Sequence, residues 1–99
     1  MIKIIRSSSE IKIKGHAGYD EPGKDIVCAG VSTLVQTLVQ SIGELTSDKI
    51  QYSMSPGTVD IRFRNLSERA QALTDSFFVG IRMIADEYPE NVQLFGDSE

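Results

Sequence analysis

The sequence predicts an α+β domain in which two helices cover an antiparallel sheet, with the elements in the order ββαββαβ. Three observations support this fold class. Two pairs of short segments alternate apolar and polar residues, as strands with one exposed face do. Two longer segments repeat apolar residues every three or four positions, as amphipathic helices do. At 99 residues, 40% hydrophobic and 24% charged, the chain has the size and composition of one globular domain spanning 1–99.

The first pair of strands is expected near residues 2–6 and 10–15. In both segments isoleucine alternates with lysine or another polar residue. The serines between the segments are typical of a turn. Strands joined by so short a connection pair antiparallel, so we expect a hairpin.

A long helix is predicted from Asp25 to about Thr46. Its apolar positions recur at helical spacing, namely Val27, Val31, Leu34, Val35, Leu38, Ile42 and Leu45. Asp25 suits the N-cap, because its carboxylate can accept hydrogen bonds from the free N–H groups of the first turn. The apolar surface is wider than one side of a small sheet requires, which favours a homodimer.

A second hairpin is predicted from residues 50–54 and 59–63, which alternate again on either side of a Pro56-Gly57 turn. A second helix should begin at Asn65, with Glu68 completing an arrangement like a capping box.

The second helix should end before Pro89, which cannot continue it. Its expected apolar stripe is Ala70, Leu73, Phe77, Ile81, Ile84 and Tyr88. Residues 92–95 are predicted to form a last short strand, followed by a frayed acidic tail.

Composition argues against several classes of function. The net charge of −4 argues against direct binding of nucleic acid, because neutralising phosphates requires a basic face. An acidic surface instead suits a basic polypeptide partner. The single cysteine cannot form an internal disulfide, which fits a reducing cytoplasm. The first apolar run is too short for a signal peptide, and no segment is expected to approach the roughly 20 apolar residues of a membrane span.

The only histidine and the only cysteine lie twelve residues apart, on either side of a glycine-containing loop. His16 follows a predicted strand, and Cys28 lies in the first turn of the long helix. A thiol attacks as a thiolate, which the helix dipole alone stabilises by only roughly 0.3–1 kcal/mol. A neighbouring imidazolium stabilises it far more. A Cys28–His16 pair could therefore attack a carbonyl, with N–H groups around Cys28 forming an oxyanion hole.

The same two residues also admit a structural interpretation. Free cysteine is among the most buried residue types, so Cys28 could face the core. His16 could be a strand-end residue bonded to a backbone carbonyl. No paired Cys or His spacing predicts a metal site, and the glycines form no phosphate-binding loop, so we expect neither a metal nor a cofactor.

Two short blocks resemble the signature of the ribosomal-processing cysteine protease (Prp) family. They are Gly15-His16-Ala17 and Asp25-Ile26-Val27-Cys28-Ala29, the second followed by Val31-Ser32. The resemblance implies a small, cytoplasmic, homodimeric cysteine endopeptidase that removes a short N-terminal extension from a large-subunit ribosomal protein. It also implies that Cys28 is the nucleophile and His16 its general base and acid.

Asp25 and Ser32 also match positions of that signature. We interpret Asp25 as helix cap and orienter of the site, and Ser32 as a hydrogen-bonding support. Both residue types favour such local backbone roles over catalysis. Gly18, Pro22 and Gly23 allow a flexible loop over residues 17–24 that closes on an extended peptide.

Two other functions stay open at this point. One is a non-enzymatic, ribosome-associated module that binds a peptide, in which Cys28 is structural or redox-sensitive. The other is a thiol hydrolase acting on a small ester or amide. An extended groove beside Cys28 would favour the protease, and a closed pocket would favour the small substrate.

Overall fold

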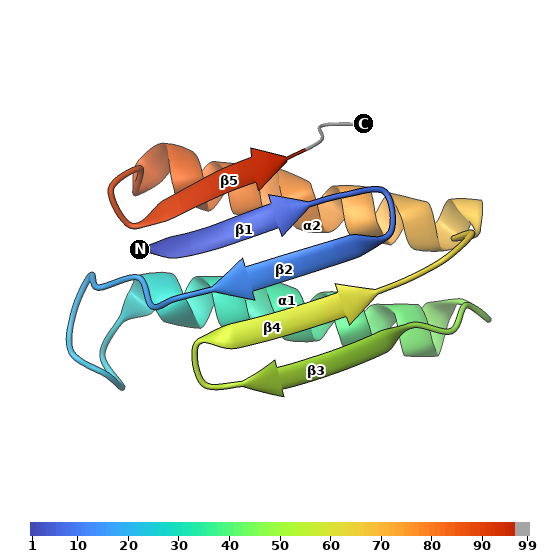
Figure 1. Ribbon diagram of the computed structural model, residues 1–99, viewed down its shortest axis with the longest axis horizontal. Coiled ribbons are helices and arrows are strands. Elements are labelled where there is room, and N and C mark those ends of the chain that lie inside the picture. Colours follow the sequence, from blue (N-terminus) through green and yellow to red (C-terminus); the bar gives the residue numbers. More distant parts are fainter. Residues whose placement is uncertain (97–99) are drawn as a thin grey trace.

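The computed structural model describes residues 1–96, in which the predicted elements occur in the predicted order (Figure 1). The strands are β1 Ile2–Arg6, β2 Glu10–Lys14, β3 Gln51–Ser55, β4 Thr58–Arg62 and β5 Val92–Gly96. The helices are α1 Ile26–Leu45 and α2 Glu68–Glu87. The fold class and element order are therefore confirmed. The acidic tail expected after residue 96 lies outside the described residues.

The five strands form one sheet in the order β3-β4-β2-β1-β5. The two predicted hairpins pair antiparallel, and so do β2 and β4. Strand β5 instead runs parallel to β1, with Val92 opposite Ile2, so the sheet is mixed rather than wholly antiparallel. The reason is the crossover through α2, which returns the chain to the end of the sheet where β4 began.

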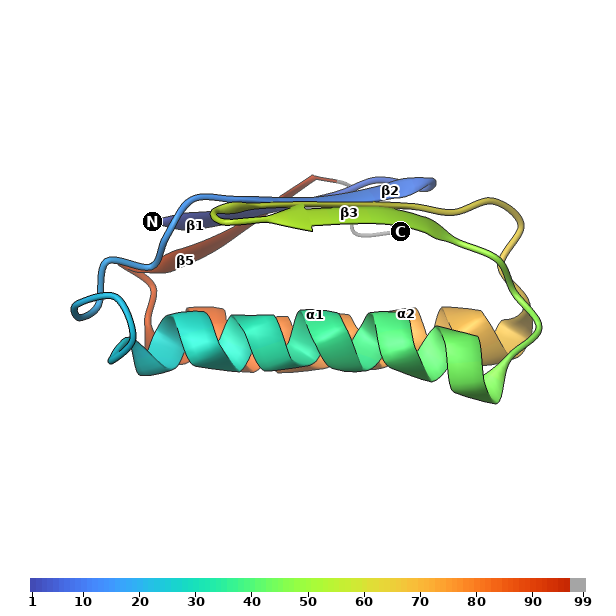
Figure 2. The same ribbon diagram turned by 90° about the horizontal axis from the view of Figure 1, so that it is seen from below.

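Both helices lie on the same face of the sheet and leave the other face open (Figure 2). The covered face carries the alternating isoleucines of β1 and β2, which are almost fully buried. Five predicted positions of α1 complete this layer: Val27, Val31, Val35, Leu38 and Ile42. Leu45 was expected on the same stripe but is 53% exposed, because the helix ends there.

The buried face of α2 differs in part from the predicted stripe. Ala70, Phe77 and Ile81 are buried as predicted, whereas Thr74 and Phe78 are buried without having been expected. Thr74 can be buried because its hydroxyl donates to the carbonyl oxygen of Ala70 at 3.0 Å.

Helix α2 does not begin where the sequence suggested. Its N-cap is Ser67, whose Oγ accepts from the N–H of Ala70 at 3.2 Å. Asn65 has a φ of 52° and belongs to the preceding loop. Glu68 is consequently the first helical residue rather than the third, so the predicted capping box does not form.

Helix α1 is long and apolar enough, by length and composition, to cross a membrane. The expectation that no segment approaches such a span is therefore wrong. In this fold one side of α1 is buried in the core, namely Val27, Val31, Val35, Leu38 and Ile42. The core helix of a globular protein can have the same length and apolar composition as a membrane span.

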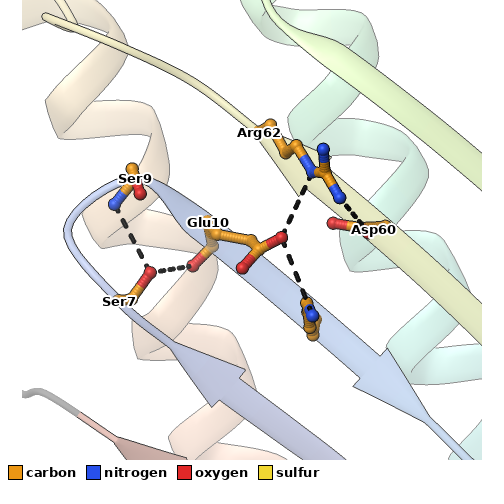
Figure 3. A network of polar contacts seen from close by, with 6 residues as sticks. Ser7, Ser9, Glu10, Asp60 and Arg62 are labelled. Atoms are coloured by element: carbon orange, nitrogen blue, oxygen red, sulfur yellow. Dashed lines mark hydrogen bonds and ion pairs between the residues drawn. The ribbon is translucent and has the colours of Figure 1, made fainter.

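The open face of the sheet carries a polar network between β2 and β4 (Figure 3). Glu10 contacts Arg62 at 3.2 Å and Lys12 at 3.9 Å, and Arg62 contacts Asp60 at 3.5 Å. Such exposed ion pairs contribute roughly 0–1 kcal/mol each. The network lies at the beginning of β2, whereas His16 follows its other end.

Candidate active site

The end of β2 brings His16 beside the turn between β3 and β4. Lys14 is the last residue of β2 and lies opposite Thr58. The next residue, Gly15, donates its N–H to the carbonyl oxygen of Gly57 at 2.9 Å. Gly15 has a φ of 97°, and a Cβ there would collide with the carbonyl oxygen of Met1. Only glycine fits this exit from the strand.

The imidazole of His16 is exposed and lies against Gly57. A Cβ at position 57 would come within 2.9 Å of His16 Nε2. The main chain of His16 is held from the other side, where its carbonyl oxygen accepts from the main-chain nitrogen of Met1 at 2.6 Å. The glycine of the β3–β4 turn therefore leaves the room that the ring occupies.

Cys28 is the third residue of α1 and is half-buried. Its Sγ accepts a hydrogen bond from the N–H of Ala17 at 3.3 Å. Cys28, His16 and Ser32 line the same cleft, whose volume is about 350 Å³. The sulfur packs partly against the core and still reaches this cleft, so the purely buried interpretation of Cys28 does not describe it.

The cleft lies between the first half of α1 and the β3–β4 hairpin and is open to solvent. Its lining is mostly apolar: Ile2, Ile13, Val31, Val35, Met54, Pro56 and Val59. The polar groups among its lining residues include His16, Cys28 and Ser32. The lining gives the cleft an apolar wall beside the thiol.

Asp25 is the N-cap of α1, as predicted, and its two carboxylate oxygens have separate tasks. Oδ1 accepts from the N–H groups of Val27 and Cys28, each at 3.0 Å. Oδ2 accepts from those of Tyr19 at 2.9 Å and Asp20 at 3.2 Å. Burial opposes ionisation of this side chain, but the four N–H donors outweigh it and hold its pKa below the usual value. Asp25 thus joins the loop to the helix, although it does not line the cleft.

The N–H groups around Cys28 are already paired in this structure. Those of Val27 and Cys28 donate to the Asp25 carboxylate, and that of Ala29 donates to the Asp25 carbonyl oxygen at 3.0 Å. The expected oxyanion hole from these groups is therefore not formed, because an N-cap takes up the same free donors. The N–H that approaches the sulfur comes from Ala17 instead.

The first half of the loop over residues 17–24 makes the contacts that hold the loop next to the site. Tyr19 packs edge-on against Tyr88 at the end of α2, with ring centroids 5.2 Å apart. Gly18 and Gly23 have φ values of 69° and 87°, which glycine adopts readily. Together with Pro22 they shape the loop but do not line the cleft.

Three contacts beside the site were not predicted from the sequence: that of Gly57 with His16, that of the Ala17 N–H with Cys28, and that of Asn91 with Ala17. Asn91 Nδ2 donates to the carbonyl oxygen of Ala17 at 2.9 Å across 74 residues of sequence. The Pro-Gly turn was recognised, but its approach to His16 depends on β4 pairing with β2, which are not consecutive strands. Within residues 1–96, no group of three or more His, Cys, Asp or Glu side chains is placed to hold a metal ion.

Known proteins that are similar to this chain identify its family. A family model described as cysteine protease Prp matches residues 1–93. A ribosomal processing cysteine protease Prp of Staphylococcus aureus is 35% identical over 89 residues, covering 87% of this chain and 84% of that protein. A relative from Mycoplasma genitalium with the same name is 27% identical over 100 residues, covering 99% and 98%.

The solved structures agree with the sequence comparison. The S. aureus protease with a covalently linked product peptide superposes with a TM-score of 0.88 at 29% identity, covering 97% of each chain. The extent of the family match and the shared architecture lead to one conclusion: this chain belongs to the ribosomal processing cysteine protease (Prp) family and is a cysteine protease.

Proposed function

We propose that this protein is an endopeptidase that removes a short N-terminal extension from a large-subunit ribosomal protein, with Cys28 as nucleophile and His16 as general base and acid. The observation that carries the proposal is their common cleft: the imidazole and the thiol line it together, and the sulfur accepts an N–H from the His16–Ala17 peptide. These are the groups that nucleophilic cysteine catalysis requires.

The proposed reaction proceeds in two steps. His16 takes the thiol proton, and Cys28 Sγ attacks the carbonyl carbon of the scissile peptide bond. The protonated imidazole then gives its proton to the leaving amine, so that the C–N bond breaks and a thioester remains. In the second step His16 takes a proton from water, and the resulting hydroxide attacks the carbonyl carbon of the thioester. The C–S bond breaks, the imidazolium returns the proton to Sγ, and the acid product leaves.

A peptide substrate fits the cleft better than a small ester or amide does. The cleft is open to solvent and lined by apolar side chains from α1 and from the β3–β4 hairpin. The S. aureus relative has been crystallised with a substrate peptide, in a structure that superposes with a TM-score of 0.81 at 28% identity. We therefore expect apolar side chains of an extended peptide to occupy the cleft beside Cys28.

We assign supporting roles to Asp25 and Ser32. Asp25 holds the first turn of α1, and with it Cys28, against the loop that comes after His16. Ser32 lies one helical turn after Cys28 and lines the same cleft, where its hydroxyl can bond to the substrate main chain. Gly18, Pro22 and Gly23 give the loop over residues 17–24 the freedom to close on a bound peptide.

We also propose that the enzyme works in the cytoplasm as a homodimer. Helix α1 carries a single charged residue, Glu44, over its 20 positions, so its outer face is unusually uncharged for a solvent-facing helix. Light scattering should give twice the chain mass at micromolar concentration. A monomer mass would contradict the dimer.

The function is tested by incubating the protein with a candidate precursor and reading the new N-terminus by mass spectrometry. We expect one cleavage that releases the extension. Cys28→Ala should lower the rate by at least about 1,000-fold while its circular dichroism spectrum stays that of the wild type. Full cleavage by the folded alanine variant would contradict the proposed nucleophile.

A further inference from the structure

We propose that Asn91 is a positioning residue for this reaction: its side chain fixes the main chain at Ala17, so that the Ala17 N–H stays directed at the Cys28 sulfur. The inference rests on the proposed role of Cys28. Asn91 lies 63 positions beyond Cys28, between α2 and β5, and belongs to neither sequence block that pointed to the site.

The side chain of Asn91 stands on a main chain that is itself well held. Its N–H donates to the carbonyl oxygen of Tyr88 at 2.9 Å, and its carbonyl oxygen accepts from the N–H of Ile2 at 2.8 Å. From this base Nδ2 reaches the carbonyl oxygen of Ala17 at 2.9 Å. The anchor therefore links the end of α2 and the beginning of β1 to the segment after His16.

Ala17 is the residue through which His16 and Cys28 are connected. Its side chain is 2% exposed, its carbonyl oxygen accepts from Asn91, and its N–H donates to Cys28 Sγ at 3.3 Å. The preceding carbonyl oxygen, that of His16, is held by the main-chain nitrogen of Met1. Three contacts from three different parts of the chain thus define the main chain over residues 16–17.

The Asn91 contact matters for chemistry because the residue after Ala17 is a glycine. Gly18 has a φ of 69° and can adopt several other conformations, so the peptide between Ala17 and Gly18 is free to flip once its carbonyl loses a partner. A flip would loosen the segment that carries the N–H at the sulfur. A donor to sulfur favours the thiolate over the thiol, so a loosened donor leaves the nucleophile less ionised.

The test compares the wild type with Asn91→Ala and Asn91→Asp. The alanine variant removes the donor without adding a charge. The aspartate variant keeps the size of the side chain but cannot donate at neutral pH. Thr74→Ala is the matched control, because it removes a side-chain bond to a carbonyl oxygen within α2, and Thr74 is not among the residues that line the cleft.

Three quantities are measured for each folded variant: kcat and KM on the precursor, the thermal midpoint, and the rate of iodoacetamide alkylation of Cys28 against pH. For both Asn91 variants we expect kcat to fall about 10-fold with little change in KM, and the alkylation midpoint to move to higher pH. Thr74→Ala should lower the thermal midpoint while its alkylation profile stays that of the wild type.

The alkylation profile decides the outcome. Asn91 variants that lose stability but keep the wild-type profile and kcat would overturn the proposal, because Asn91 would then be a structural residue only. If Asn91→Ala fails to fold, Asn91→Leu provides the same comparison, because leucine is close to asparagine in size and carries neither a donor nor a charge. A wild-type enzyme that leaves the precursor intact would contradict the proposed function, whereas the alkylation of Cys28 would still test the role of Asn91.

Discussion

The two helices begin with similar capping devices at opposite ends of the molecule (Figure 1). Each has 20 residues, and at each N-terminus an aspartate accepts hydrogen bonds, at α1 from the first turn and at α2 from the N-cap residue. At α1 this residue is the N-cap itself, Asp25. At α2 it is Asp48, which accepts from the Oγ of the N-cap Ser67 at 2.5 Å and from its N–H at 2.8 Å.

The difference lies in what else each carboxylate holds. Asp48 bonds mainly to Ser67 and so joins the α1–β3 connection to α2. Asp25 divides its oxygens between the helix, which carries Cys28, and the loop after His16. The Asp48 contacts therefore join a connection to a helix, while the Asp25 contacts join the helix of the proposed nucleophile to the loop that follows the proposed base. Three experiments can break or sharpen this comparison, and a fourth tests the contact between His16 and the β3–β4 turn.

The largest difference is expected between Asp25→Ala and Asp48→Ala. Both variants should have a lower thermal midpoint, because each removes the hydrogen bonds at a helix N-terminus. Asp25→Ala should also lower kcat by about 100-fold, since small displacements of reacting groups have effects of that size. Asp48→Ala should retain kcat within about 2-fold, measured on the precursor with the folded enzyme. Equal losses of kcat in the two variants would refute the distinction.

A smaller loss is expected from Gly57→Ala. The added methyl group would lie 2.9 Å from His16 Nε2 and would displace the imidazole, so we expect kcat to fall about 10-fold. Gly43→Ala controls for the added methyl group, because Gly43 lies in α1 away from the cleft and no atom lies within 4 Å of the Cβ added there. If the two variants lose the same kcat per folded molecule, the contact with His16 does not matter.

Asp25→Asn should break the hydrogen bonds of residue 25 to the loop and keep those to the helix. Asparagine caps helices about as well as aspartate, so the first turn of α1 should persist. Its amide nitrogen cannot accept the N–H groups of Tyr19 and Asp20, and the loop should be released. We expect a kcat about 5-fold below that of the wild type and a thermal midpoint that falls less than in Asp25→Ala. Faster amide hydrogen exchange confined to the loop would locate the effect.

The smallest effect is a dependence of stability on acid pH. The N–H and hydroxyl donors lower the pKa of both Asp25 and Asp48 in the folded protein. The unfolded chain therefore binds more protons as the pH falls, and the stabilisation, complete above the ordinary value of about 3.9, is lost below it. Urea unfolding between pH 5 and pH 2 should show this decline. In the double variant Asp25→Asn, Asp48→Asn the decline should be shallower.

Local patterns were sufficient to predict most of the fold. Alternation predicted both hairpins, and helical spacing predicted both long helices together with the N-cap at Asp25. The errors occurred where the outcome depends on contacts distant in sequence. Asn65 was predicted as the N-cap of α2, but the N-cap is Ser67, whose N–H donates to Asp48, 19 residues earlier in the chain. The parallel pairing of β5 follows from the crossover through α2 rather than from the residues of β5.

The two central residues of the candidate site could be predicted from the sequence, but some of the residues that hold them could not. His16 and Cys28 stand out in the sequence because each is the only residue of its type, and the structure brings both to one cleft. The neighbours that hold them were not predictable from spacing. Gly57 reaches His16 through the pairing of β2 with β4, and Asn91 reaches Ala17 from the far end of the chain.

The pH dependence of Cys28 alkylation, measured in the wild type and in His16→Ala, tests the pairing of imidazole and thiol most directly. Iodoacetamide labels the single cysteine, so the signal belongs to one residue. We predict that the imidazole speeds alkylation of Cys28 near neutral pH and that His16→Ala slows it there, so that the profile of the variant moves to higher pH. A wild-type profile that the substitution leaves in place would contradict the pairing.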